Sequence, residues 1–260
     1  MNKILQLTLL LTILVSCKAE LQRENDFGIK GDFKKLIIIN YRTKKDSLGK
    51  SIKDTISIVN YKVNKRGKVK KSVTQLFSHN KIIDTVTSKY LYNSIGQTIK
   101  EITDTKSNKT NFEINYYYKN ELLDVIKMRD TLEGFILELT ENYSYDANDK
   151  LKLRESNQLA YNQIKKDTFS FQKVIFKYDK NEFQIESDWN ELFSDFPNLK
   201  EYYKNDSLGL LQETISFNKL TKKTDTIIYI YKYDINNNWI NSKSFKNNTL
   251  DQITDRVIEY

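Results

Sequence analysis

Side chains able to do enzyme chemistry are few in this 260-residue chain. It holds one histidine, His79, in the segment LFSHNK, and one cysteine, Cys17. A Ser-His-Asp triad would have to use His79, but the residues on either side of it do not resemble a nucleophile elbow. One cysteine and one histidine cannot build a cysteine or paired-histidine metal site. We therefore expect no catalytic residue, no cofactor and no metal ligand.

Carboxylates are the plentiful reactive group, with 34 Asp and Glu residues. A glycosidase needs only two of them. No pair stands out by its spacing, so polysaccharide hydrolysis remains a second alternative function. The segments DINNN (234–238) and DAND (146–149) begin like calcium-binding loops but lack the glycine and the closing glutamate of such a loop. We interpret both segments as turns.

The first residues are typical of a targeting segment rather than of a part of the folded domain. Lys3 supplies a positive charge, and an apolar run follows from Ile4 to Val15. As a helix these twelve residues would reach about 18 Å, which is too short for a bilayer core of about 30 Å. Residues 1–16 are therefore predicted to be a signal peptide that is removed from the mature chain.

The end of this segment, Leu14-Val15-Ser16-Cys17, resembles the lipobox of bacterial lipoproteins. The resemblance implies cleavage before Cys17 and acylation of its sulfur and its new amine, with palmitate among the chains. No other cysteine exists to form a disulfide with it. Three acyl chains, each gaining about 0.8 kcal/mol per buried methylene, would hold the protein on a lipid bilayer permanently. We expect a bacterial cell-envelope protein, on the periplasmic or surface face of the outer membrane.

Residues 17–34 are polar and lack periodicity, which predicts a lipidated tether ahead of a single domain at 35–260. The formal charge of the whole chain is +8, but 34 acidic residues are interleaved with 42 basic ones. This mixture is typical of a solvated surface. Because the basic residues are spread out, and because the protein would face away from the cytoplasm, we expect no nucleic-acid partner.

A repeat of about 25 to 33 residues runs along the domain. Each copy reads aromatic, any residue, aromatic, then turn formers, then an apolar strand, as in Ile228–Ile240, IYIYKYDINNNWI. Alternation places Tyr229, Tyr231 and Tyr233 on one face of a strand. Asp and Asn close turns because their side chains bond the nearby backbone and because they tolerate left-handed conformations. Each copy is therefore predicted to be a β-hairpin. The return strands are predicted to alternate as well, with Leu151 and Leu153 on one face.

Seven or eight such hairpins can bury their apolar faces by pairing side by side. The sequence thus predicts an all-β fold, an antiparallel meander forming a curved sheet, half-barrel or roll. The dipeptide Asp-Thr recurs upstream of the tyrosine strands, for example at 84–85 and 130–131. We interpret it as structure, with Asp suited to a turn and Thr to a strand.

The YxYD hairpins resemble YD-repeat proteins of the RHS type, and more closely the short YD-like lipoproteins of Bacteroidota. The resemblance covers most of residues 37–260. It implies the β-meander, whereas the chain is far too short for the toxin-enclosing shells of large RHS proteins. The chain departs from the pattern because most copies lack the turn glycine of YD repeats.

One segment breaks the alternation. Trp189, Leu192, Phe193 and Phe196 follow helical spacing, which predicts a short helix near 188–196, capped by Ser187 or Asp188 and ended by Pro197. Its aromatic residues would either plug one end of the sheet or form a lid over a ligand.

The leading functional hypothesis is a non-catalytic binding module for a glycan, a peptide or an envelope protein. Trp189 and Trp239 are the candidate residues for stacking on sugar faces, with core packing as the alternative for both. A partner-specific immunity or assembly-accessory lipoprotein is the first alternative function, motivated by the membrane tether and the missing catalytic groups.

Overall fold

The computed structural model describes residues 29–30, 32–45, 50–64, 67–106, 111–132, 135–162, 164, 168–191 and 198–260. Within these residues the chain is all-β, with sixteen strands and no helix. Cys17 and the signal peptide lie outside the described residues. The strands, in chain order, are β1 (Lys35–Lys45), β2 (Ser51–Val63), β3 (Val69–Ser78), β4 (Lys81–Tyr92), β5 (Thr98–Thr105), β6 (Asn111–Lys119), β7 (Leu122–Leu132), β8 (Phe135–Tyr145), β9 (Leu151–Asn162), β10 (Thr168–Tyr178), β11 (Gln184–Glu191), β12 (Leu199–Asn205), β13 (Leu211–Asn218), β14 (Thr224–Tyr233), β15 (Trp239–Lys246) and β16 (Thr249–Glu259).

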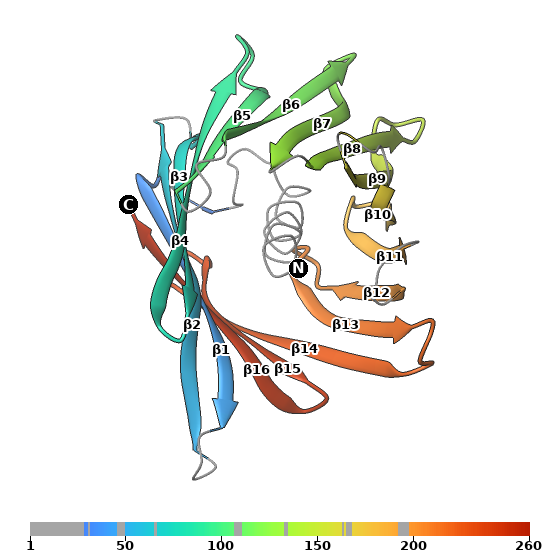
Figure 1. Ribbon diagram of the computed structural model, residues 1–260. Coiled ribbons are helices and arrows are strands. Elements are labelled where there is room, and N and C mark those ends of the chain that lie inside the picture. The colour runs from blue at the N-terminus through green and yellow to red at the C-terminus, as the bar shows by residue number, and fades with distance from the viewer. Residues whose placement is uncertain are drawn as a thin grey trace.

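Every strand pairs antiparallel with its neighbours in the sequence, and β1 also pairs with β16. The sheet is therefore a closed barrel, which Figure 1 shows as a ring of strands. The predicted meander of hairpins is confirmed, and its closure goes further than the curved sheet, half-barrel or roll that the sequence predicted. Closure removes both free edges of the sheet, where unpaired backbone groups would otherwise remain.

The two ends of the barrel differ in their connections. We call one end the N-terminal rim. It holds the start of β1, the end of β16 and the turns that follow the even-numbered strands β2 to β14. We call the other end the opposite rim. Two of its turns, His79-Asn80 and Asn247-Asn248, have two residues that both adopt positive φ, as in the tight turns typical of hairpins.

Six turns of the N-terminal rim share one construction. Each begins with Asp or Asn and places its fourth residue at positive φ, as at Gly96, Asp149 and Asn237. The oxygen of the first side chain accepts backbone N–H groups further along the turn. Asp234, for example, accepts from the N–H groups of residues 236 and 238 at 2.9 and 2.8 Å. The predicted turns at 146–149 and 234–238 are thus confirmed, and the carboxylates there are occupied by the backbone.

A bulge follows each of these turns and shifts the alternation of the return strand. In the hairpin of β8 and β9, Tyr145 pairs with Leu151, but Ser144 pairs with Leu153. Leu151 therefore packs on the inner core, and beyond the bulge Arg154 and Ser156 occupy the buried face. The prediction that Leu151 and Leu153 share a face was wrong, because one extra residue at the bulge changes the side to which later residues point.

In β4, β6 and β8, a tyrosine at or next to the end of the strand ties its hairpin to the preceding one. The hydroxyl of Tyr92 donates to the Val69 carbonyl at 2.6 Å, and that of Tyr145 donates to the Leu123 carbonyl at 2.7 Å. Tyr118 bonds the Thr98 carbonyl in the same way, at 2.9 Å. This contact explains why the repeat needs a tyrosine at this position, since phenylalanine would leave the carbonyl without this donor.

The largest group of buried apolar side chains lies on the inner face of β6 to β8. Its buried members are Phe112, Ile114, Tyr116, Ile126, Met128, Leu139 and Tyr143. A second group joins the start of the described chain to the barrel. Ile29, Phe33 and Leu36 are buried there beside Tyr61 and Ile258. The segment just before β1, expected to be tether, is thus packed against the barrel from Ile29 onward.

The short helix expected near 188–196 was wrong for its described part. Residues 188–191 continue strand β11, and residues 192–197 lie outside the described residues. Ser187 and Asp188, expected as helix caps, are strand residues on opposite faces, and Ser187 is buried. Of the four residues that gave the helical spacing, Trp189 is the one that lies among the described residues, and it belongs to strand β11.

Candidate ligand-binding site

A set of polar side chains occupies the inner face of three adjacent strands. We call it the interior polar cluster; its members are Glu141, Arg154, Ser156, Gln158 and Tyr178. Pairing places Glu141 opposite Ser156 across β8 and β9. The side chains of Glu141, Arg154 and Ser156 are each 1% exposed, which is unusual for groups that water normally solvates. Sequence reasoning missed all five as a set, and for Arg154, Ser156 and Gln158 the reason is the bulge that precedes them on β9.

Arg154 is held between an aromatic ring and a carboxylate. Its guanidinium carbon lies 3.8 Å from the centroid of the Phe176 ring, with which it pairs across β9 and β10. Burial is the largest single effect and by itself would lower the pKa of Arg154, but Glu141, Tyr178 and Tyr143 together outweigh it and the pKa is raised. The guanidinium is therefore a permanent cation inside the barrel.

Glu141 is the counter-charge in the cluster. One of its oxygens, Oε2, accepts the Tyr143 hydroxyl at 2.8 Å. Burial first, and then the charge of Glu141, raise the pKa of Tyr143 well above its ordinary value. Tyr143 thus stays protonated and remains a hydrogen-bond donor at any physiological pH.

Several atoms of the cluster have no hydrogen-bond partner among the described residues. They are Glu141 Oε1, Arg154 Nε and Nη1, Ser156 Oγ, Gln158 Oε1 and Tyr178 Oη. A buried donor or acceptor without a partner costs about 1–3 kcal/mol, so this many would consume much of a domain's stability. Groups of this kind are satisfied by ordered water or by a polar ligand. Both donors and acceptors occur among these atoms, which matches hydroxyl groups, because a hydroxyl both donates and accepts.

Two further carboxylates on the inner face are already bonded to tyrosines. Glu101, fully buried on β5, accepts the Tyr116 hydroxyl at 3.2 Å. Glu201 on β12 accepts the Tyr203 hydroxyl at 2.7 Å. These pairs line the same inner surface as the interior polar cluster, but their carboxylates have protein partners. We interpret them as structural.

The two tryptophans predicted as sugar-stacking residues both contact other side chains of the barrel. Trp189 donates from Nε1 to Ser187 at 2.8 Å and meets Phe176 edge to face, with ring centroids 6.2 Å apart. The guanidinium carbon of Arg256 lies 4.2 Å from the ring centroid of Trp239, and Tyr231 meets the same ring at 5.8 Å. Trp189 adjoins the interior polar cluster, whereas Trp239 lies at the start of β15.

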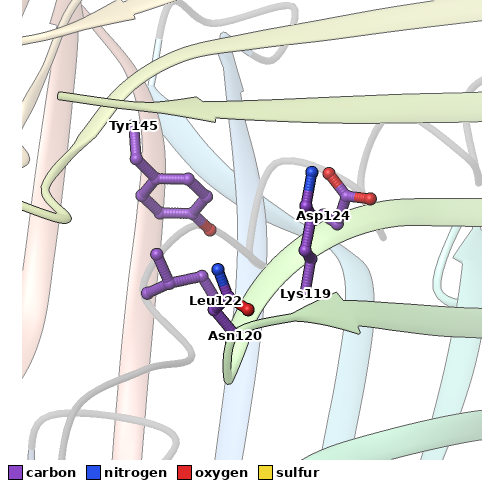
Figure 2. A pocket seen from close by; sticks show the side chains of 5 residues that line it. All are labelled: Lys119, Asn120, Leu122, Asp124 and Tyr145. Carbon is purple, nitrogen blue, oxygen red and sulfur yellow. The ribbon is translucent and has the colours of Figure 1, made fainter. Parts of the chain in front are cut away.

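A shallow hollow opens at the N-terminal rim beside the turn between β6 and β7. Figure 2 shows its lining by Lys119, Asn120, Leu122, Asp124 and Tyr145. Its volume is about 130 Å³, well below the roughly 300–1,000 Å³ of typical ligand pockets. We therefore place no ligand there.

The remaining groups with possible chemistry are isolated. His79 lies in an exposed turn, where Nδ1 is 3.0 Å from the Ser78 hydroxyl. Among the described residues no group of three or more His, Cys, Asp and Glu side chains could hold a metal ion. Within the same residues no helical segment has the length and hydropathy needed to cross a membrane.

The outer face of the barrel carries ion pairs between neighbouring strands. Arg129 and Glu138 pair directly across β7 and β8 at 3.3 Å, and Lys177 and Glu186 across β10 and β11 at 2.8 Å. A diagonal pair, Lys100 with Glu113, joins β5 and β6 at 2.7 Å. Exposed pairs of this kind add little stability, but they place charged side chains on the outer wall, which also carries exposed apolar residues such as Ile215 and Ile228.

Comparison with solved structures supports the barrel architecture. A porin-like protein from Bacteroides uniformis shares the fold with a TM-score of 0.52 at 12% identity, over 87% of this chain and 98% of that one. A porin-like protein from Bacteroides vulgatus aligns over 84% of this chain and 96% of that one, at 14% identity and a TM-score of 0.32. No protein-family model matches the sequence, and no curated protein matches it either.

Proposed function

We propose that the chain is a non-catalytic lipoprotein of the bacterial cell envelope whose barrel binds a polyhydroxylated ligand, such as a glycan, on its inner wall. The observation that carries this proposal is the interior polar cluster, where donors and acceptors without protein partners face the barrel interior together. Sugars are recognised by such mixed hydrogen-bonding groups beside aromatic rings, here those of Phe176 and Trp189.

The anchor in this proposal is Cys17. Residues 1–16 would be removed, acyl chains on Cys17 would enter the outer membrane, and residues 17–34 would lead to the domain at 35–260. The YD-like ancestry of the hairpins is part of the same proposal. The outward-facing pair of Arg129 and Glu138, well inside β7 and β8, supports a barrel that stands in water beside the bilayer, because an Arg or Lys at the lipid-facing midplane of a barrel costs about 2–4 kcal/mol.

Binding would be tested with full-length, detergent-solubilised protein against a panel of envelope polysaccharides and their oligosaccharides. Trp189 should report binding through a change in tryptophan fluorescence, because it adjoins the cluster. Gln158→Ala should lower the affinity for the saccharide about tenfold, because it removes one hydrogen bond of about 1.4 kcal/mol. Asn157→Ala is the matched control, since Asn157 is the neighbouring residue on the outer face and bonds Glu155. No response to any saccharide, or equal loss in both variants, would argue against the proposal.

A partner-specific lipoprotein, for immunity or assembly, remains the first alternative. It is supported by an exposed apolar row on the outer face, where Tyr202 pairs with Ile215 across β12 and β13 and Ile228 lies on the next strand. Recovery of one stoichiometric protein from solubilised envelopes, lost in Ile215→Ser, would favour it.

A polysaccharide hydrolase is the second alternative. Its motivation is that two carboxylates, Glu101 and Glu141, lie close enough to Tyr116 to affect its pKa. Burial is the largest cause of the raised pKa of Tyr116, and the charges of the two carboxylates raise it further. Turnover of a polysaccharide that disappears in Glu141→Gln would be required.

A further inference from the structure

Three turns of the N-terminal rim expose an apolar side chain at the tip. Ile95, Leu208 and Ile235 are 62%, 55% and 98% exposed. They lie in the turns after β4, β12 and β14, so all three point out of the same end of the barrel. A single exposed isoleucine needs no explanation. The nearly complete exposure of Ile235, together with two further apolar tips on the same rim, does need one.

The chain that leads from Cys17 reaches the barrel at the same place. Both backbone polar groups of Lys30 bond the side chain of Asn238, the N–H donating to Oδ1 at 2.7 Å and the carbonyl accepting from Nδ2 at 3.0 Å. Asn238 closes the turn whose tip is Ile235. The most exposed isoleucine and the attachment of the tether therefore belong to one turn.

Chain length keeps this rim near the anchor. Lys30 lies thirteen positions after Cys17 (30 − 17), a span of at most about 45 Å when fully extended. The opposite rim lies a further strand length away, about 30 Å for a tilted strand of eleven residues. The N-terminal rim is thus the end that an anchored barrel brings to the membrane with the least extension of its tether.

We propose that the N-terminal rim rests on the lipid bilayer, with Ile95, Leu208 and Ile235 in the headgroup region. This inference depends on the proposed acylation of Cys17. The rim carries charges of both signs. Lys150 and Lys180 lie in the turns after β8 and β10, and Asp206 and Asp234 lie in the turns after β12 and β14. The contact is therefore apolar rather than electrostatic, and it needs no anionic lipid. It leaves the opposite rim facing away from the membrane.

The opposite rim supplies matched controls. Ile164 and Leu220 are 87% and 68% exposed at its turns, so they have the same chemistry without proximity to the tether. Because Cys17 is the chain's one cysteine and acylation would consume its thiol, a single added cysteine can be labelled selectively. Ile235→Cys and Ile164→Cys would each carry an environment-sensitive fluorophore on full-length protein reconstituted in phosphatidylcholine vesicles.

The label at position 235 should shift to shorter wavelength and be quenched several-fold more by lipids with a spin label near the headgroup than the label at 164. Raising the salt concentration should not change this difference. Equal quenching at the two positions, or stronger quenching at 164, would overturn the rim assignment. Intact mass of the same samples separates the two proposals: acylated protein without quenching at 235 rejects the rim alone, and unacylated protein rejects the anchor on which it rests.

Discussion

The guanidinium carbon of Arg154 lies 3.8 Å from the centroid of the Phe176 ring, and both side chains are buried on the inner wall of the barrel. The ring and the carboxylate of Glu141 together hold a cation where water is scarce. A buried charge of this kind is costly unless it is compensated. Arg154 therefore links two properties of the barrel, its stability and its capacity to bind a polar ligand.

Removing the cation alone should destabilise the fold strongly. Arg154→Met keeps much of the side-chain volume but leaves Glu141 buried without its counter-charge, which typically costs about 3–5 kcal/mol. The double variant Glu141→Gln with Arg154→Met should recover a large part of this loss, because neither charge remains. The free energy of unfolding from guanidinium titrations of the two single variants and the double variant gives the coupling. Additive losses in the double variant would show that the two charges do not compensate each other.

Much of the architecture could be predicted from the sequence because the repeat encodes its own turns. Asp or Asn at the first turn position, and a residue that tolerates positive φ at the fourth, are visible at Asp146 and Asp149 and again at Asp234 and Asn237. Alternating tyrosines then place the strands. These are local signals, since each depends on contacts within a few residues.

Closure of the barrel and the face of the return strands could not be predicted in the same way. Closure depends on the pairing of Lys35 with Glu259, which are separated by almost the whole domain. The inner position of Arg154 depends on a bulge that shifts the period of the strand after Leu151. For Trp189 the helical pattern of neighbouring apolar residues competed with the strand period, and long-range pairing of β11 decided the outcome.

Two glycines in equivalent turns should respond differently to the same substitution. Gly96 and Gly209 adopt φ of +86° and +80°, so alanine at either position costs about 1 kcal/mol in backbone strain. An added Cβ at Gly96 meets nothing within 4 Å, whereas at Gly209 it would lie 2.5 Å from the Phe183 ring. Gly209→Ala should therefore lose about 1–3 kcal/mol more than Gly96→Ala.

Thermal unfolding of the two glycine variants measures this difference. Adding Phe183→Leu to Gly209→Ala should restore part of the loss, because the smaller side chain makes room for the methyl group. Equal melting temperatures for the two alanine variants would mean that the Phe183 ring moves away from the added methyl group at little cost.

Alkaline pH should destabilise the barrel through its buried tyrosines. Burial raises the pKa of Tyr118 to about 12, from an ordinary value of 10.0. Between these values the unfolded chain loses the hydroxyl proton while the folded chain keeps it, so stability falls as pH rises from about 10 to about 12. Tyr118→Phe should make this pH dependence shallower, although it also removes the hydrogen bond to the Thr98 carbonyl and lowers stability at neutral pH.

The pH dependence is measured as the urea midpoint at a series of pH values from 8 upward, for the wild type and Tyr118→Phe. The variant should start less stable and converge toward the wild type as pH rises. Curves that stay parallel over the whole range would show that Tyr118 ionises equally in the folded and unfolded chains.

The attachment of the N-terminal segment should depend on one amide side chain. Asn238 is 4% exposed and bonds both backbone groups of Lys30 as well as the Tyr260 hydroxyl, at 2.8 Å. Asn238→Ala removes all three bonds at about 1 kcal/mol each. Hydrogen exchange should then rise at residues 29–34 and stay unchanged in β8 to β10, because the apolar contacts of Ile29 and Phe33 alone do not fix the backbone of this segment.

Asn236→Ala is the control for this prediction. Asn236 is exposed in the same turn, and the variant keeps the backbone N–H that donates to Asp234. Unchanged exchange at residues 29–34 in Asn238→Ala would assign the attachment to Ile29, Phe33 and Leu36 instead.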